Sequence, residues 1–419
     1  MSYRVAGFSG SLIVGSLLAK FVLSKRSTVT SEWFNLLERR FLPAYFLATL
    51  ADWLQGPYVY ALYAHYGFSK AEIGQLFVVG FGTSAIVGPL VGSFADSYGR
   101  KKSCLLYCLL YVVTCLTKHI NNYSVLMLGR VTGGVATSIL FSSFDSWMVA
   151  THHQGSAEMS TGPVFSKMVF GNGLVAIAAG VVGAIVADRF GMVAPFDVAI
   201  VSLIAAFILI LFTWTENHGK AEESSVNSIH LSLRECWENT SLLWAGLVQA
   251  SFESAMYIFV LNWTPALPSQ INHGEVFAGF MAATMVGSNV CSWHERRGGA
   301  PEDMVVLCFL WGFVSLLVPV VMTEWFFRIV AFCSFEVAVG MYFASFYTVR
   351  AEVVSDQHRA TVLNIFRILP NILVIGFCLS SGYLGVEVTL LICCGLLVVG
   401  LFSAAKLHER LSIKEDIDL

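Results

Sequence analysis

The sequence predicts an all-α integral membrane protein made of two six-helix bundles and one extra N-terminal membrane helix. Three observations predict this class. Of the 419 residues, 56% are hydrophobic and only 13% are charged, about half the charged fraction of a typical soluble domain. The mean hydropathy is +0.70, and apolar runs recur along the chain at close to the roughly 20 residues that a membrane-spanning helix needs. Basic residues gather at alternate ends of those runs, as expected when cytoplasmic loops retain positive charge.

The first apolar run, 6–24, predicts an uncleaved anchor helix with its N-terminus outside. It is interrupted by Lys20 and followed by Lys25 and Arg26, whereas a signal peptide carries its positive charges before the apolar stretch. Twelve further runs follow, and the longest polar break divides them into six and six. We therefore predict an anchor and cytoplasmic segment (1–41), a first bundle (42–214), a cytoplasmic central loop (215–240), a second bundle (241–405) and a cytoplasmic tail (406–419). The predicted spans are 6–24, 42–63, 72–95, 103–118, 123–149, 167–188, 195–214, 241–263, 274–293, 303–322, 324–349, 360–383 and 386–405.

The orientation follows from lysine and arginine. If the loop with Arg100, Lys101 and Lys102 is cytoplasmic, 18 of the 25 basic residues lie at cytoplasmic ends, four lie outside and three lie within spans. This bias fixes the topology and accounts for the charge pattern without a nucleic-acid partner. Asn122 and Asn262 then fall near outer loops as candidate glycosylation acceptors.

Several function classes lack their motifs. The ten cysteines are scattered, with neither a CxxC pair nor a Cys/His cluster at metal spacing, so they are expected to be reduced and buried. There is no P-loop and no nucleophile–base set. The sequence therefore predicts neither an enzyme nor a bound metal or cofactor.

The loop GSFADSYGRKK, residues 92–102, joins the second and third spans of the first bundle. Small residues on one helix face let two helices approach closely. Asp96 lies near the end of the span, where Arg100 is an available partner across a turn at Gly99. An alternative interpretation is that the basic residues only determine the membrane topology. It would not explain Asp96 or the glycines. The candidate gate residues are Gly92, Asp96, Gly99, Arg100 and Lys101.

Polar and charged residues inside the spans are the candidate substrate and coupling site. A charge at the bilayer centre costs at least about 2.5–3.5 kcal/mol, so each needs a function or a partner. Asp52 with Gln55, and Gln249 with Glu253, share helix faces by spacing, and Tyr58 lies one turn from Gln55. Structural ion pairs between helices are the alternative interpretation. The candidates are Asp52, Gln55, Tyr58, Arg130, Asp145, Gln249, Glu253, Glu336 and Arg367.

Two further features concern helix shape and duplication. Gly56-Pro57 and Pro370 predict bends in the first and eleventh helices of the core. When the two halves of the sequence are aligned with an offset of 198 residues, Arg130 matches Arg328 and Gln55 matches Glu253. Such matches are what duplication of a six-helix unit would leave.

Three strings carry a family resemblance: ADWLQGPYVYALY (51–63), LGRVTGGVATSILFSSFDSWM (128–148) and QASFESAMYIFVLNWTP (249–265). With the 92–102 loop and the leading helix, they resemble the molybdate-anion transporter family of the major facilitator superfamily, from about residue 42 to the last span. In that superfamily the loop resembles a latch on the cytoplasmic side, and an arginine at the place of Arg130 is tied to proton coupling. The second-half counterpart, 288–298, departs from the loop pattern, which puts a matching second latch in doubt.

The resemblance implies uptake of molybdate, a tetrahedral dianion, by a monomeric carrier in the plasma membrane lipid bilayer. It also implies that the first, fourth, seventh and tenth core helices line a central cavity. Arg130, Arg367 and Lys167 are then candidate cations, and Gln55, Tyr58, Gln249 and Asn172 are candidate donors. A carboxylate could hold an arginine in the empty state and take a proton as the anion arrives, which would make protons a second partner.

Two alternatives stay open at the level of sequence. The aromatic and amide residues of the first and seventh core helices would also suit a sugar-like or other small organic solute. A membrane scaffold or sensor that kept the fold without transport is the other alternative.

Overall fold

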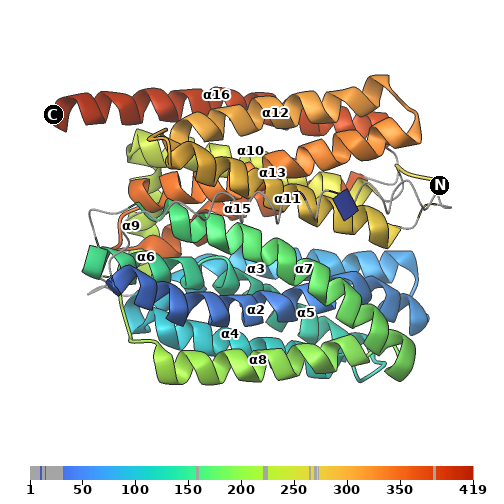
Figure 1. Cartoon of the computed structure of the whole chain (residues 1–419). Coiled ribbons are helices and arrows are strands. Elements are labelled where there is room, and N and C mark those ends of the chain that lie inside the picture. Colours follow the sequence, from blue (N-terminus) through green and yellow to red (C-terminus); the bar gives the residue numbers. More distant parts are fainter. Residues whose placement is uncertain are drawn as a thin grey trace.

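The computed structural model describes residues 10–11, 15, 32–156, 160–219, 225–263, 266–268, 271, 273–380 and 384–418. The predicted anchor span 6–24 lies outside the described residues, apart from positions 10, 11 and 15. Long helices account for most of the described chain (Figure 1). Their bounds are α2 (Glu32–His65), α3 (Lys70–Tyr98), α4 (Arg100–Thr117), α5 (Tyr123–Leu140), α6 (Ser143–Ser156), α7 (Gly162–Phe190), α8 (Ala194–Thr213), α9 (Ser225–Glu238), α10 (Thr240–Asn262), α11 (His273–Glu295), α12 (Pro301–Val321), α13 (Trp325–Val353), α14 (Arg359–Phe366), α15 (Ile368–Ser380) and α16 (Val386–Asp418).

Ten helices in the described ranges are long and apolar enough to cross a membrane. Pairs α5–α6 and α14–α15 each count as one such helix. Helices α2 and α4 fall outside the ten: α2 carries Asp52 and Gln55 in its middle, and α4 begins with three basic residues. Both run alongside the others in the bundle (Figure 1), and they fall on the predicted spans 42–63 and 103–118, so the count of twelve core spans stays a prediction.

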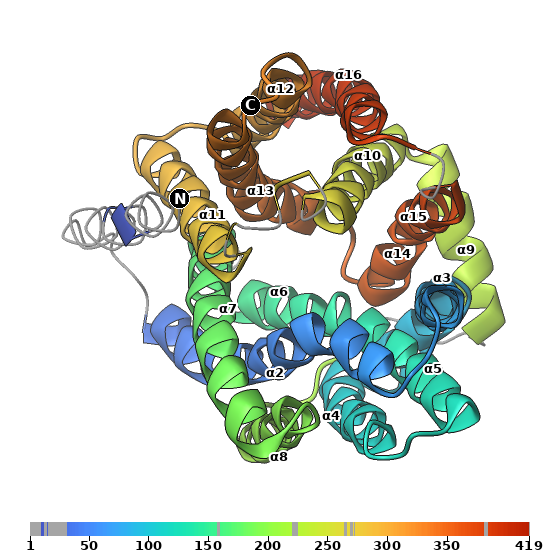
Figure 2. The ribbon, with the colours of Figure 1, turned by 90° about the vertical axis from the view of Figure 1, so that its right-hand side faces the viewer.

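The helices form two groups, α2–α8 and α10–α16, seen from one end in Figure 2. Each group has its own large hydrophobic cluster. Helix α2 packs against α7 and α8 in the first group, and α10 and α12 pack against α16 in the second. The groups meet where α3 contacts α14 and α15, and where α7 contacts α11 and α13. Two lines of contact therefore join the halves.

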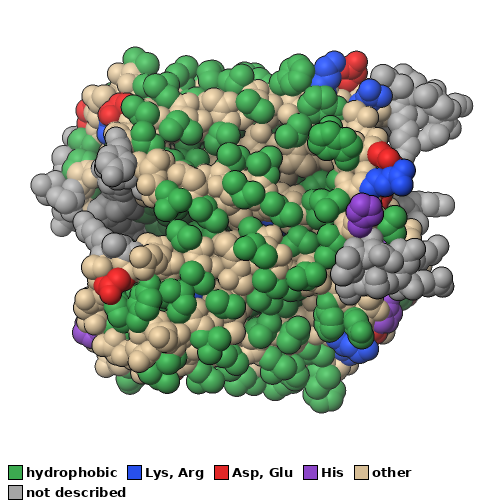
Figure 3. Space-filling model, turned by 180° about the vertical axis from the view of Figure 1, so that it is seen from behind, with side chains coloured by type: hydrophobic (Ala, Val, Ile, Leu, Met, Phe, Trp, Pro, Cys, Tyr) green, Lys and Arg blue, Asp and Glu red, His purple; other side chains and the backbone are tan. Residues whose placement is uncertain are grey.

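The flanks of the molecule are apolar and its ends are polar. Hydrophobic side chains cover the face shown in Figure 3, and charged side chains gather at its right-hand edge. Large apolar residues such as Ile86, Phe212 and Val321 are 76–79% exposed, which suits contact with lipid rather than water. We call the end that carries Arg100, α9 and the C-terminus of α16 the inner end, and the opposite one the outer end.

Two of the predicted spans are broken. The predicted span 123–149 is interrupted at Phe141 and Ser142, between α5 and α6. Hydroxyl groups there donate to carbonyls one turn back, Ser142 to Ser138 at 2.6 Å and Ser146 to Ser142 at 2.7 Å, a contact that often bends helices.

The predicted span 360–383 is interrupted at Arg367, between α14 and α15. Pro370 lies three residues beyond the break and has no N–H for the preceding turn. This confirms the bend predicted at Pro370. Gly56-Pro57, by contrast, does not interrupt α2, and a bend there stays a prediction.

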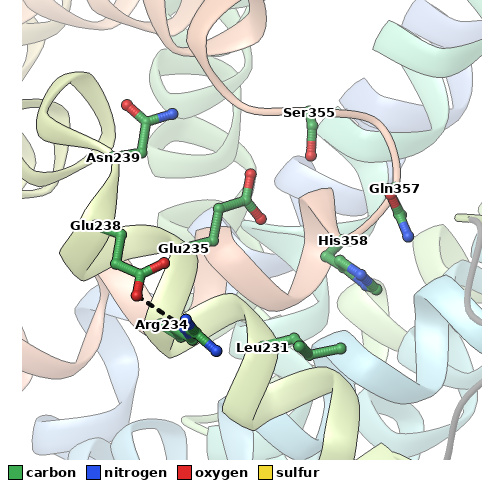
Figure 4. Close-up of a pocket in the computed structure, with 8 residues that line it drawn as sticks. All are labelled: Leu231, Arg234, Glu235, Glu238, Asn239, Ser355, Gln357 and His358. Atoms are coloured by element: carbon green, nitrogen blue, oxygen red, sulfur yellow. Dashed lines mark hydrogen bonds and ion pairs between the residues drawn. The ribbon is translucent and has the colours of Figure 1, made fainter.

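Helices also fill segments predicted as loop and tail. The predicted central loop contains α9, which packs against α3, α10 and α14, and the predicted tail continues α16 to Asp418. Helix α9 is amphipathic, with Leu233 and Trp237 exposed. Together with the segment before α14 it lines a pocket of about 680 Å³ at the inner end (Figure 4).

Both candidate glycosylation acceptors have structural partners. The Asn122 side chain caps α5 by accepting from the amides of Ser124 and Val125. The Asn262 amide donates to the Ile258 carbonyl at 2.8 Å. Glycosylation of either residue stays a prediction.

Candidate functional site

Arg350 on α13 links the two halves in the interior. Its residue is 2% exposed. One guanidinium nitrogen lies 2.6 Å from Oδ2 of Asp145 on α6, and another donates to Oε1 of Gln249 on α10 at 3.1 Å. The guanidinium also lies over the Tyr347 ring, 3.8 Å from its centroid. Asp145 and Gln249 thus share one cation.

Arg367 lies at the break between α14 and α15 and is only 6% exposed. Its guanidinium stacks over Phe141, 4.5 Å from the ring centroid, and Phe141 is itself at the break between α5 and α6. In the part of the chain that the structure describes, Arg367 forms no ion pair, and its Nε has no hydrogen-bond partner. Tyr257 of α10 is a hydrogen-bond partner of the same guanidinium. A buried guanidinium without an acid in ion-pair contact is costly unless other groups supply the charge.

Two carboxyl groups complete this central group. Glu253, one turn beyond Gln249, is buried within electrostatic reach of Arg367 and Arg350. Asp52 is half-buried, accepts a hydrogen bond from the Tyr111 hydroxyl and also lies within electrostatic reach of Arg367. The structure therefore gathers Asp52, Asp145, Gln249, Glu253, Arg350 and Arg367 at the junction of the halves.

Four predicted site residues lie outside this central group. Gln55 donates to the Ala51 carbonyl of its own helix at 3.1 Å. Tyr58 packs against Gly183 of α7. The other two are Arg130, which donates to the Leu76 carbonyl at 3.1 Å and stacks on Phe77, and Glu336, which contacts Thr284.

The two remaining candidate ligands are also engaged elsewhere. The Lys167 ammonium pairs with Glu38 at 2.5 Å. The Asn172 side chain accepts from the Trp53 indole N–H at 2.9 Å. Both side chains therefore have partners outside the central group, and neither is available to an anion there.

Sequence reasoning missed Arg350, the best-connected cation of the centre. The predicted span 324–349 ends one residue before it and so leaves it among the charges at cytoplasmic ends, whereas α13 runs to Val353. The structure reveals it through the length of α13, whose 29 residues leave Arg350 about one turn inside the end of the helix.

The inner end carries the predicted pair. Asp96 and Arg100 are both fully buried, and Nη2 of Arg100 lies 3.0 Å from Oδ1 of Asp96, so the predicted pairing is confirmed. Asp96 also accepts from the backbone amides of Ala360 at 3.2 Å and Thr361 at 2.9 Å, and from the Thr361 hydroxyl at 3.0 Å. These amides begin α14 in the other half, and a helix N-terminus favours a carboxylate.

The glycines of this loop allow two different contacts. A Cβ atom on Gly92 would lie 2.4 Å from the Ala360 carbonyl oxygen, so only glycine lets α3 touch α14. Gly99 has a φ of +122°, which favours glycine. It faces Glu216, whose carboxylate accepts from the Lys101 amide at 2.8 Å. Gly92, Asp96 and Arg100 therefore reach the other half, whereas Gly99 and Lys101 act within the first.

Further contacts close the inner end. Arg100 donates to the Asp356 carbonyl at 2.5 Å, and the Asp356 carboxylate lies 2.9 Å from Nδ1 of His153 on α6. Burial alone would raise the pKa of the Asp356 carboxyl, but the His153 hydrogen bond and the charges of Arg359 and His153 hold it below its usual range. In the second half, the Glu295 carboxyl lies against Gly162 at the start of α7. The segment 288–298 thus keeps one acid at a helix start.

Two six-helix halves, with paired charges at their junction and a closed contact at one end, define a membrane transporter of the major facilitator type. Residues 3–342 match a family of sugar transporters with 12 transmembrane segments. The Xenopus laevis molybdate-anion transporter is 36% identical over 81% of this chain and 78% of its own length, and the Danio rerio one is 33% identical over 88% and 84%. The chain belongs to the major facilitator superfamily and, within it, to the molybdate-anion transporter family.

Solved structures share the fold at low identity. The transporter FucP in its outward conformation has a TM-score of 0.69 and 14% identity, covering 88% of this chain and 98% of that one. The human organic anion transporter MFSD10 has a TM-score of 0.67 and 12% identity, covering 90% and 100%. The chain is therefore a multi-pass membrane transporter rather than an enzyme.

Proposed function

We propose that this protein is a secondary transporter that takes up molybdate across the plasma membrane by alternating access, working as a monomer. The observation that carries the proposal is Arg367. This guanidinium is buried between the halves, lies at a break in its helix and has no acid paired with it among the described residues. A tetrahedral dianion would supply a negative group in direct contact, which Glu253 and Asp52 do not give it in this conformation. The names of the relatives support molybdate as that anion.

Arg367 suits an oxyanion chemically. Guanidinium presents five N–H donors in a planar fork and accepts none, and charge-assisted hydrogen bonds to oxyanions are among the strongest in proteins. Arg350 is the second cation in this proposal. Asp145 and Gln249 hold it in the empty state, and it turns toward the anion when Asp145 releases it.

The inner contacts set the direction of access. Asp96 holds the start of α14, Asp145 holds Arg350, and the Asn364 amide donates to the Ser142 hydroxyl at 2.9 Å. All three contacts join one half to the other on the inner side of the molecule. Transport requires them to part, together with the contact between Glu295 and the start of α7.

The test is uptake of labelled molybdate in a host cell that lacks its own carrier. We expect uptake that tungstate or sulfate displaces and that sugars do not. Arg367→Gln should lower uptake roughly 10- to 100-fold, because a hydrogen bond to a charged group contributes about 1.5–3 kcal/mol. The matched control is Arg297→Gln, which removes an exposed guanidinium stacked on Trp293 and should leave uptake nearly unchanged.

Surface protein must be measured for each variant. Loss of uptake at normal surface amount supports Arg367 as a ligand. Displacement by sugars instead of oxyanions would replace the proposal with the organic-solute carrier. Normal uptake by Arg367→Gln would remove this residue from the site.

A further inference from the structure

Glu336 is a buried carboxyl that the anion site does not use. It lies in α13 and is 5% exposed. The polar contact that the structure gives its side chain is with the Thr284 hydroxyl of α11, where Oε2 and Oγ1 are 3.0 Å apart. A carboxylate in this position would be an uncompensated charge in the membrane interior.

The hydrogen bonds of the Thr284 hydroxyl indicate which protonation state of the Glu336 carboxyl is favoured. Its oxygen also lies 3.1 Å from the Phe280 carbonyl oxygen. A carbonyl only accepts, and a hydroxyl has a single hydrogen but two acceptor positions. When that hydrogen is directed at Phe280, the contact with Glu336 requires the carboxyl to donate. Only a protonated carboxyl has a hydrogen to donate. A neutral Glu336 therefore satisfies both contacts at once, whereas a carboxylate would compete with the Phe280 carbonyl for the single hydroxyl hydrogen.

The helices that pack around α13 carry no cationic side chain at the depth of Glu336. Helices α7, α10, α11 and α12 pack against α13. The stretch 168–187 of α7 has no titratable side chain, and no lysine, arginine or histidine occurs in α10, in 276–293 of α11 or in 304–321 of α12. The titratable groups that these stretches and the neighbouring part of α13 present are Glu253 and Tyr257 of α10, Cys291 of α11, Cys308 of α12, and Cys333 and Tyr342 of α13.

The crossing of α11 and α13 at this point is unusually close. A Cβ atom on Gly340 would lie 2.0 Å from the Thr284 carbonyl oxygen, and one on Gly287 would lie 2.1 Å from that of Val337. Both helices also contact α7 of the other half. Movement of the halves therefore acts directly on the pair of helices that holds Glu336 and Thr284.

We propose that Glu336 is a proton-binding site of the carrier, separate from the anion site. It holds a proton in the conformation shown and releases it when α11 and α13 shift against α7. Each proton carried inward offsets one charge of the dianion. The coupling part of this inference rests on the proposed function, whereas proton binding itself does not.

Proton binding is tested on the purified, full-length protein by infrared spectroscopy. The wild type should show the carbonyl stretch of a protonated carboxyl at neutral pH. Glu336→Gln should lose that band, and Glu324→Gln, at the exposed start of the same helix, should keep it. A spectrum of Glu336→Gln identical to the wild type in this region would overturn the proposal.

Coupling is tested by molybdate uptake as the outside medium is made acidic. At constant internal pH, the steady-state accumulation of molybdate by the wild type should rise by up to about tenfold per pH unit of gradient for one proton, and Glu336→Gln should show no rise at equal surface amount. Its neutral amide preserves the contact with Thr284, so the variant is expected to fold. A pH-independent wild type, or a rise that persists in Glu336→Gln, would contradict coupling through this residue. Absence of any molybdate uptake would instead defeat the proposed function, and the infrared band would still decide proton binding.

Discussion

Arg350 and Arg367 are both buried arginines at the junction of the halves, yet their surroundings differ. Arg350 has an acid, an amide and an aromatic ring within contact. Arg367 has the Phe141 ring, the Tyr257 hydroxyl and an Nε without a partner, with Glu253 and Asp52 near it but not in ion-pair contact. A paired cation stabilises one arrangement of the helices, whereas an unpaired one is available to a ligand. In the proposed mechanism, Arg367 therefore contacts the anion first, and Arg350 holds the halves together until Asp145 releases it.

The Asp145–Arg350 pair should show strong coupling in stability. Removing one member of a buried ion pair costs about 3–5 kcal/mol, because the other charge is left unpaired. We expect Arg350→Gln to lower the apparent melting temperature in detergent sharply. Asp145→Asn should lower it less, since an amide oxygen can still accept from Arg350. The double variant should recover much of the loss of Arg350→Gln.

Thermal unfolding of the four proteins forms a double-mutant cycle. Additive effects of the two substitutions would contradict a direct pair between the halves. Asp303→Asn with Arg297→Gln, two exposed positions, is the control expected to be additive.

At this scale the sequence could predict which residues are buried charges but not where they point. Asp96–Arg100 was predictable because four residues across a tight turn leave little choice of partner. Gln55 and Tyr58 share a helix with Asp52, yet Gln55 turns to its own backbone and Tyr58 to α7. Rotamer and helix rotation decide such contacts, and both depend on tertiary packing.

Among the elements, α11 and α13 form the closest crossing around Glu336. Gly340→Ala should destabilise the protein on the order of 1–3 kcal/mol, since the new methyl group would overlap the Thr284 backbone and overpacking costs about that much. Gly376→Ala in α15 is the matched control, because nothing lies within 4 Å of a Cβ there. That variant should be neutral or slightly stabilised. Melting in detergent measures both, and equal melting temperatures would contradict the close crossing.

Apolar length predicted the spans well, but helix breaks and amphipathic helices were harder to predict. The break at Arg367 follows from a proline, which is visible in the sequence, whereas that at Phe141 involves serine back-bonds that are common in unbroken helices. Helix α9 was missed because the segment is polar on average, and its apolar residues recur at helical spacing only over a short stretch. Hydropathy averages conceal such a pattern.

For the whole molecule, the division into two halves and the orientation came from the polar break and the basic residues. The conformational state could not come from them, because the same sequence must form both inward- and outward-facing arrangements. The described contacts close the inner end through Asp96, Asp145 and Asn364. The partner of each of these residues lies more than 200 positions away in the sequence. Local sequence patterns do not reveal such contacts.

The closed inner end should limit the access of a thiol reagent to residues between the halves. Ser142 is fully buried and accepts from Asn364 of the other half, so a cysteine there should react with a thiol reagent only when the halves part. Asp96→Asn weakens the hold on α14 and should increase labelling of Ser142→Cys by severalfold. Ser103→Cys is the control: Ser103 is equally buried but contacts Ser143 of its own half at 3.0 Å, so its labelling should stay low. Cys236 of α9, a half-buried native thiol at the inner end, adds little background, since burial raises its pKa to about 12. Peptide-resolved mass spectrometry measures each site, and an equal rise at both cysteines would indicate local unfolding rather than gate opening.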